Sequence, residues 1–193
     1  VMCNPGVSSQ LLAEVNLNKG LQANFKGEFK QKDFDWPKQD NFVDWCNKHL
    51  PQAIHIKFTG GEPFISKHFL AILKEAVDRD VAKNIELKLT TNGSKFFKPM
   101  LMILDKFKKV KLNISIDGTE STYDYMRFPF KWDKFDGRMN ELLEHISNTE
   151  DPNKYNVQWS FLATALNYLD TANVVSKYSE YKNKYPALKY VMN

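Results

Sequence analysis

Three short motifs hold the residues of this chain whose types and spacing could do chemistry. They are Gly60-Gly61-Glu62, Thr90-Thr91-Asn92-Gly93 and Ser115-Ile116-Asp117-Gly118. Two adjacent glycines allow backbone angles that other residues avoid, and they let a ligand approach the main chain closely. Asn-Gly and Asp-Gly pairs are also common turn formers, so each motif alone is compatible with an ordinary turn.

Together, the three motifs could bind a zwitterion. Each lies at the carboxyl end of an expected strand, where ligands of parallel α/β proteins bind. Glu62 and exposed carbonyls can bind an ammonium group, whereas hydroxyls and an arginine can bind a carboxylate. Arg127 follows the third motif closely enough to be the arginine that binds the carboxylate. A surface cation is the alternative interpretation of Arg127.

A repeating strand–helix pattern positions these motifs. Such units form parallel sheets with right-handed crossovers. Strands are expected over 54–59, 85–91, 110–116, 155–164 and 188–192, and helices over 10–15, 40–50, 66–79, 99–108, 134–146 and 170–184, with a long loop over 16–39. The 193 residues are expected to form one core domain, 1–193, truncated at both ends.

The expected strands have one apolar face and one mostly polar face. In the first of them, Ile54, Ile56 and Phe58 alternate with polar residues. Strands with helices on both sides read as continuous apolar runs, so the alternation predicts helices on one side only. We therefore expect an open or partial parallel α/β barrel whose polar face holds a polar ligand. A sheet with one face in water is the alternative.

Composition excludes several classes of protein. The net charge of +4 is mild, and the basic run over 106–111 is typical of a solvated helix end rather than of a nucleic-acid interface. No apolar run is long enough to span a membrane, so no membrane partner is expected. The only two cysteines, Cys3 and Cys46, lie far apart, which favours a reducing compartment, the cytoplasm. The four histidines lack the short spacing of a zinc site.

The motifs, in this order and spacing, resemble the core of a radical S-adenosylmethionine (SAM) enzyme. Cys3-Asn4-Pro5-Gly6 comes first and Thr59-Gly60-Gly61-Glu62-Pro63 second, and Tyr123-x-x-x-Arg127 follows the two later motifs. This order is similar to the branch that carries SPASM or twitch C-terminal extensions. The resemblance runs from Cys3 to about Thr164. It implies a (β/α)6 partial barrel whose first strand is missing from the given chain.

The family's signature is Cys-x-x-x-Cys-x-x-Cys. Its thiolates hold three irons of a [4Fe–4S] cluster and leave the fourth iron open for SAM. Cys3 fits the third of these ligands, and Met2 fits the position that packs near the adenine. The resemblance therefore implies that two further cysteines lie upstream of Val1. A degenerate member of the family, without the cluster, is the alternative.

The resemblance also implies roles for the three motifs. Gly60, Gly61 and Glu62 would contact the methionine ammonium of SAM, and Arg127 would pair with its carboxylate. Ser115 and Asp117 would face the ribose or the carboxylate, and Thr91 and Asn92 would line the same pocket. No residue of 155–164 is assigned to the adenine.

The implied activity is reductive cleavage of SAM to a 5′-deoxyadenosyl radical, which abstracts hydrogen from a substrate. The implied partners are a small-molecule or peptide substrate and an electron donor such as a flavodoxin or ferredoxin. The alternative is a non-catalytic α/β barrel that binds SAM or another small polar ligand.

Overall fold

The computed structural model describes residues 13, 15–18, 20, 40–59, 61–185 and 189–192. The chain divides into two compact units, Val1–Leu50 and Pro51–Asn193. The expectation of one domain over 1–193 stays a prediction. Most of the expected helix over 10–15 and of the loop over 16–39 lies outside the described residues.

In the first unit, helix α3 spans Asp40–His49, as the sequence predicted. Cys46 on this helix is half-buried and carries a free thiol, and burial raises its pKa. The rings of Trp45 and His49 contact each other, with centroids 4.6 Å apart.

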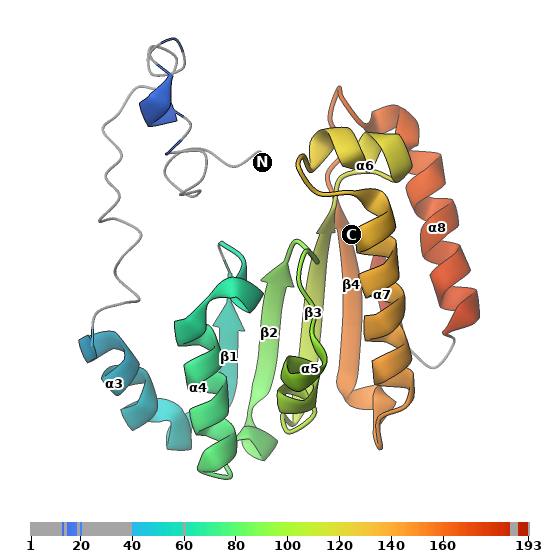
Figure 1. Cartoon of the computed structure of the whole chain (residues 1–193). Coiled ribbons are helices and arrows are strands. Elements are labelled where there is room, and N and C mark those ends of the chain that lie inside the picture. The colour runs from blue at the N-terminus through green and yellow to red at the C-terminus, as the bar shows by residue number, and fades with distance from the viewer. Residues whose placement is uncertain are drawn as a thin grey trace. The chain divides into compact units, whose positions relative to one another are not determined.

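The second unit is built on a sheet of five parallel strands (Figure 1). The strands are β1 His55–Phe58, β2 Glu86–Thr91, β3 Lys109–Ile116, β4 Tyr155–Phe161 and β5 Lys189–Met192. Their order in the sheet is β1-β2-β3-β4-β5, so every crossover joins neighbouring strands. The expected α/β class with a parallel sheet is confirmed. All five strands lie within two or three residues of their predicted bounds.

The helices of the second unit alternate with the strands. They are α4 Lys67–Asp78, α5 Lys98–Leu104, α6 Glu120–Met126, α7 Trp132–Ser147 and α8 Thr171–Lys184. Ser66 caps α4, because its Oγ accepts a hydrogen bond from the N–H of Phe69 at 3.3 Å. Helix α6 was not predicted as a helix.

Two predicted elements were too long. Helix α5 ends at Leu104 rather than at residue 108, because the N–H of Lys108 already donates to the carbonyls of Ala82 and Ile85 on the way into β3. Strand β4 ends at Phe161, because the N–H of Thr164 turns to the side chain of Asn167. Both ends depend on contacts between distant segments or on a turn, which a local apolar pattern does not reveal.

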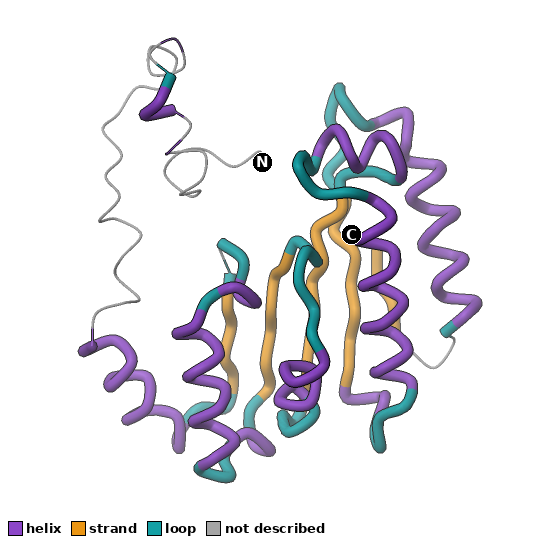
Figure 2. Tube along the Cα trace, viewed as in Figure 1, coloured by secondary structure: helices purple, strands orange, loops and turns teal. Residues whose placement is uncertain are grey.

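The helices pack on the apolar face of the sheet, as Figures 1 and 2 show for α4, α5 and α7. Aromatic rings join the two layers. Phe58 of β1 contacts Phe69 of α4, with ring centroids 4.6 Å apart, and Trp159 of β4 contacts Tyr181 of α8 at 5.5 Å. Among the described residues of this unit, no helix covers the opposite face, which is the polar one. The predicted one-sided arrangement is therefore what this unit shows.

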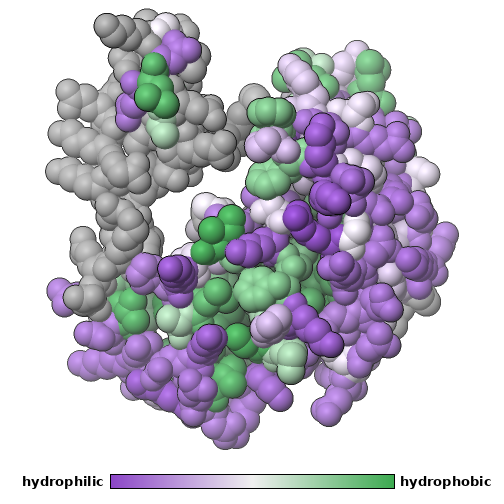
Figure 3. Space-filling view, viewed as in Figure 1, coloured by the Kyte–Doolittle hydropathy of each residue, from purple (hydrophilic) through white to green (hydrophobic). Residues whose placement is uncertain are grey.

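The outward side of the helix layer is mainly hydrophilic in the space-filling view, and apolar side chains gather near α4 and α5 (Figure 3). Within the described part of the chain, no helix is both long and apolar enough to cross a membrane.

Candidate functional site

The carboxylate of Glu62 is held at the carboxyl ends of β1 and β2. Its Oε1 accepts hydrogen bonds from the Thr91 hydroxyl at 2.7 Å and from the N–H of Phe64 at 3.3 Å. Its Oε2 accepts from the N–H of Asn92 at 2.8 Å. The first and second sequence motifs therefore meet in one site, as the parallel register requires. The three donors fix the direction in which the carboxylate points.

Burial raises the pKa of Glu62 above its ordinary value of 4.5. The hydrogen bonds from Thr91, Asn92 and Phe64 act in the opposite direction, as does the positive charge of Arg127, but burial is the larger effect. The negative charge of Glu62 is thus only partly compensated by the protein. A cation bound at this carboxylate would stabilise the ionised form.

Two glycines of the motifs need their left-handed backbone for different reasons. Gly61 has φ +56°, and a Cβ built on it would meet no atom within 4 Å, so the main chain is open on that side. Gly93 has φ +69°, and its Cβ would lie 2.7 Å from Cε2 of Phe135. Gly61 therefore leaves room beside the carboxylate, whereas Gly93 lets the second loop pack against the core. Gly60 lies outside the described residues.

The second loop is further fixed by its own side chains. The Thr91 hydroxyl accepts a hydrogen bond from the N–H of Gly93 at 3.0 Å while it donates to Glu62. The Asn92 carbonyl oxygen Oδ1 accepts from the N–H of Ser94 at 2.8 Å. The side chain of Thr91 is buried, and that of Asn92 is half-buried. Both residues thus build the loop that positions Glu62.

The third motif contributes an ion pair between Asp117 and Arg127. Arg127 Nε lies 2.7 Å from Asp117 Oδ2, and the two side chains are 20% and 26% exposed. Arg127 caps the end of α6, so this unpredicted helix carries the arginine back toward the loop after β3. Because the Arg127 charge lowers the pKa of Glu62, the arginine also acts on the first motif. The predicted pairing of Arg127 with a bound carboxylate stays a prediction.

Ser115 lies on the polar face of β3, opposite Ser160 of β4 in the register, and is half-buried. Asn113, two residues earlier on the same face of β3, lies opposite Gln158. Its Oδ1 accepts a hydrogen bond from the Ser160 hydroxyl at 3.1 Å. The polar face below the rim therefore offers hydroxyl and amide groups.

Asn167 and Asp170 support the site, and sequence reasoning did not single out either of them. The side-chain amide of buried Asn167 donates to the carbonyls of Asp117 and Leu162, at 3.0 Å each. Asp170 accepts from the N–H of Thr119 at 2.5 Å and from its hydroxyl. These bonds join the loop after β3 to the loop after β4. Only the fold brings the partners together, because they lie about 50 residues apart.

The other predicted site residues, Met2 and Cys3, lie outside the described residues, together with Gly60. Within the described part of the chain, no group of three or more His, Cys, Asp or Glu side chains could hold a metal ion. The described residues therefore supply no ligand set for an iron–sulfur cluster.

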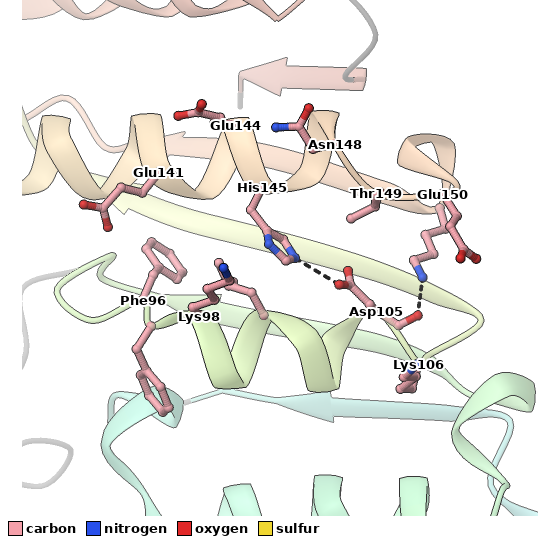
Figure 4. Close-up of a pocket in the computed structure, with 13 residues that line it drawn as sticks. Phe96, Lys98, Asp105, Lys106, Glu141, Glu144, His145, Asn148, Thr149 and Glu150 are labelled. Atoms are coloured by element: carbon pink, nitrogen blue, oxygen red, sulfur yellow. Dashed lines mark hydrogen bonds and ion pairs between the residues drawn. The ribbon is translucent and has the colours of Figure 1, made fainter.

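A hollow of about 650 Å³ lies between α5 and α7, on the helix side of the sheet (Figure 4). His145 Nε2 lies 3.0 Å from Asp105 Oδ2, and the hydroxyl of Tyr155 donates to Asp105 Oδ1 at 2.5 Å. The ammonium of Lys154 donates to the Asp105 carbonyl. Because Tyr155 is the first residue of β4, this cluster lies at the end of the sheet opposite the motifs. It connects α5, α7 and β4.

Comparisons with known proteins include a sequence relative and a solved protein of similar structure. The chain is 30% identical over 113 residues to an S-adenosylmethionine-dependent nucleotide dehydratase of Selenomonas ruminantium. The aligned region covers 54% of this chain and 39% of the relative. The chain thus spans well under half the length of the curated relative it matches. No protein-family profile matches the chain.

The structural similarity is to Streptococcus suis SuiB, at 16% identity and a TM-score of 0.47, over 78% of this chain and 43% of that chain. A structure of the same protein bound to S-adenosylmethionine gives a TM-score of 0.41 over the same shares, at 15% identity. The motif order and the sequence match to the dehydratase agree with each other. The chain is therefore related to the radical SAM enzymes.

Proposed function

We propose that this chain is the core of a radical SAM enzyme and that its three motifs bind SAM at the carboxyl ends of β1–β3. The observation that carries the proposal is the setting of Glu62. Its carboxylate is half-buried, fixed by three donors and only partly compensated in charge, and it stands beside the open backbone of Gly61. This arrangement fits a bound ammonium group such as that of SAM.

The chain's residues would divide the recognition of SAM between them. Glu62 would bind the ammonium, and the main chain at Gly61 would allow the ligand to approach closely. Ser115 would offer its hydroxyl to the ribose or the carboxylate. Arg127, which pairs with Asp117 along its Nε edge, would use its remaining N–H groups for the carboxylate. Binding at such a partly buried rim also excludes water from the ligand.

In this proposal, a [4Fe–4S] cluster, when bound, supplies the electron that cleaves SAM to a 5′-deoxyadenosyl radical. Cys3 is the proposed ligand from this chain, and it lies outside the described residues. A flavodoxin or ferredoxin in the cytoplasm is the proposed source of the electron. The name of the related dehydratase makes a nucleotide a candidate substrate, beside the small molecules and peptides that the family resemblance implies.

Binding of SAM to the full-length protein, reconstituted anaerobically with iron and sulfide, tests the proposal. Titration calorimetry with SAM should show a 1:1 complex in the wild type, and Glu62→Ala should weaken it by about tenfold or more, because a charge-assisted contact is lost. Glu141→Gln is the matched control, since Glu141 is exposed on α7 in the helix layer. Unchanged SAM affinity in Glu62→Ala would contradict the assignment of the pocket.

The same samples separate the enzyme from a degenerate binding barrel. The enzyme should show the broad visible absorption of a [4Fe–4S] cluster and should release 5′-deoxyadenosine after reduction with dithionite. A protein that binds SAM but neither takes up iron nor forms 5′-deoxyadenosine would be the non-catalytic barrel instead.

A further inference from the structure

The polar face of the sheet carries three lysines in one cross-strand row. Lys57 of β1 is the register partner of Lys88 of β2, and Lys88 is the register partner of Lys111 of β3. Asn156 of β4 continues the same line. We call Lys57, Lys88 and Lys111 the lysine row. Its members alternate with buried apolar residues such as Leu87 and therefore face away from the helix layer.

The lysine row concentrates positive charge on this face. Neighbouring strands lie about 4.8 Å apart, so three ammonium groups can gather within about 10 Å of one another. Like charges directly opposite each other destabilise a sheet. Among the described residues, none of the three lysines forms an ion pair with a carboxylate. Glu86 lies on the same face of β2, two residues before Lys88. Its Oε2 is 3.4 Å from Nδ1 of His55 rather than beside a lysine of the row.

Two features indicate that the lysine row is more than a solvated surface. Lys88 and Lys111 are half-buried, whereas Lys57 and most lysines of the helices are exposed. The Oδ1 of Asn156, at the end of the line, is buried and has no hydrogen-bond partner in the described part of the chain. The line therefore ends on an unsatisfied buried acceptor rather than on open solvent.

The lysine row lies in line with the proposed SAM site. Lys111 precedes Ser115 by four residues on one strand, which places the row about 13 Å below the rim along β3. Asn113 and its register partner Gln158 lie between the two levels and offer neutral hydrogen-bonding groups, and Ser160 lies opposite Ser115 at the rim. A ligand that reaches from the rim to the row therefore meets neutral polar groups first and positive charge last.

The chemistry of the row favours an anion of high charge density such as an oligophosphate. Lysine binds phosphate as a compact point charge, so its attraction grows with the negative charge of the anion. Consecutive phosphates of an oligophosphate also present several negative charges in a line, as the row presents positive ones. We propose that the polar face binds a substrate with an oligophosphate group, which lies on Lys57, Lys88 and Lys111. This inference rests on the proposed function, because it places the reactive part of the substrate at the rim.

Sodium tripolyphosphate is the probe that tests the lysine row in the full-length, reconstituted protein. Calorimetry should show binding that weakens by about tenfold or more in the triple variant Lys57→Gln, Lys88→Gln, Lys111→Gln, and that also weakens as salt is added. The matched control is Lys67→Gln, Lys74→Gln, Lys108→Gln. It removes the same charge from exposed lysines outside the row and should bind tripolyphosphate as the wild type does.

Citrate provides the comparison with carboxylates, since it carries up to three charges on carboxyl groups. Tripolyphosphate carries more negative charge than citrate at neutral pH, so we expect citrate to bind at least about tenfold more weakly to the wild type. Without any anion, the row variant should melt at a higher temperature than the control variant, because repulsion among the lysines is removed. Equal tripolyphosphate affinity in the two triple variants, or citrate binding as tight as tripolyphosphate, would overturn the inference.

Titration with SAM keeps the two proposals apart. The row variant should bind SAM with unchanged affinity, and Glu62→Ala should keep its affinity for tripolyphosphate. If the wild type binds no SAM, the proposed function fails, and the tripolyphosphate result still decides whether the row binds phosphate. If SAM binds and the row variant keeps full tripolyphosphate affinity, only the inference about the row fails.

Discussion

The hydroxyl of Thr91 donates a hydrogen bond of 2.7 Å to Oε1 of Glu62, a residue 29 positions earlier in the chain. The bond joins the ends of two neighbouring parallel strands. The Thr91 hydroxyl also accepts a hydrogen bond from the N–H of Gly93. It therefore links the backbone of the second loop to the Glu62 carboxylate. The candidate site therefore depends on this hydroxyl as much as on the acid.

Replacing Thr91 by valine should weaken both the fold and the binding of SAM. Valine keeps the shape but leaves the Gly93 N–H without its acceptor and Glu62 without one donor, so we expect a loss of about 1–3 kcal/mol in the free energy of unfolding. Urea denaturation and SAM calorimetry measure the two effects. Thr149→Val is the control, because Thr149 donates only to the carbonyl of Ile146 at the end of α7. Unchanged SAM affinity in Thr91→Val would show that Glu62 needs no support from this hydroxyl.

The raised pKa of Glu62 predicts a specific pH dependence of stability. Between pH 4.5, where the unfolded side chain ionises, and the raised pKa of the folded protein, the folded state holds a proton that the unfolded state has released. The contribution of Glu62 to stability is therefore fully present below pH 4.5 and is lost as the pH rises through the folded pKa. The difference in urea midpoint between wild type and Glu62→Gln, followed across this range, isolates the effect. The wild type should lose stability relative to the variant as the pH rises. A constant difference would mean that the pKa of Glu62 is not raised.

Affinity for SAM should change in the opposite direction with pH. An ammonium group prefers the ionised carboxylate, so SAM should bind more tightly as Glu62 loses its proton. Calorimetry of the wild type should show affinity rising with pH and then levelling off, whereas Glu62→Gln should show no such rise. An identical pH profile in the two proteins would assign the ammonium to another group.

Alanine substitutions at Gly61 and Gly93 should separate ligand access from core packing. Both positions have positive φ, which costs alanine about 1 kcal/mol or more. Gly93→Ala adds a clash with the buried ring of Phe135, so its thermal midpoint should fall further than that of Gly61→Ala. Gly61→Ala should instead lose SAM affinity out of proportion to its stability. Equal loss of stability in the two variants would contradict the close packing of Gly93.

Asn167→Ala should weaken the hold on the Asp117 loop although Asn167 is not among the proposed SAM ligands. The substitution removes side-chain bonds to the Asp117 and Leu162 carbonyls and the acceptor for the N–H of Thr164, all in a buried setting, so we expect a loss of about 2–4 kcal/mol. SAM affinity should fall as well, because the Asp117 loop is released. Asn153→Ala, at an exposed turn, is the control and should change neither quantity. Wild-type stability in Asn167→Ala would show that the two loops are held together by other contacts.

The sequence predicted the sheet well because each strand alternates between an apolar and a polar face. In Leu87, Leu89 and their neighbours, that alternation alone fixes which side the helices cover. It also placed Glu62, Thr91 and Asn92 at one rim, since the carboxyl ends of parallel strands meet there. The bonds that Glu62 accepts from Thr91 and Asn92 show how closely these motifs come together.

Other parts of the site were not predictable from local pattern. Helix α6 is only seven residues long and has no long apolar stripe, yet it carries Arg127 to Asp117. Asn167 lies between two predicted elements and Asp170 begins the predicted helix over 170–184. Their partners in the loop after β3 lie about 50 positions away. Such contacts follow from the order of the strands in the sheet.

Because Gly93 packs closely against the buried ring of Phe135, the loop that binds Glu62 belongs to the hydrophobic core. The N–H groups of Asn92 and Gly93 are both bonded to side chains, and the loop that holds them cannot move away without opening that packing. These two amides should therefore exchange with deuterated solvent as slowly as those of the central strands, even without ligand. In this protein, the rate of hydrogen exchange at a binding loop would report the global unfolding of the sheet.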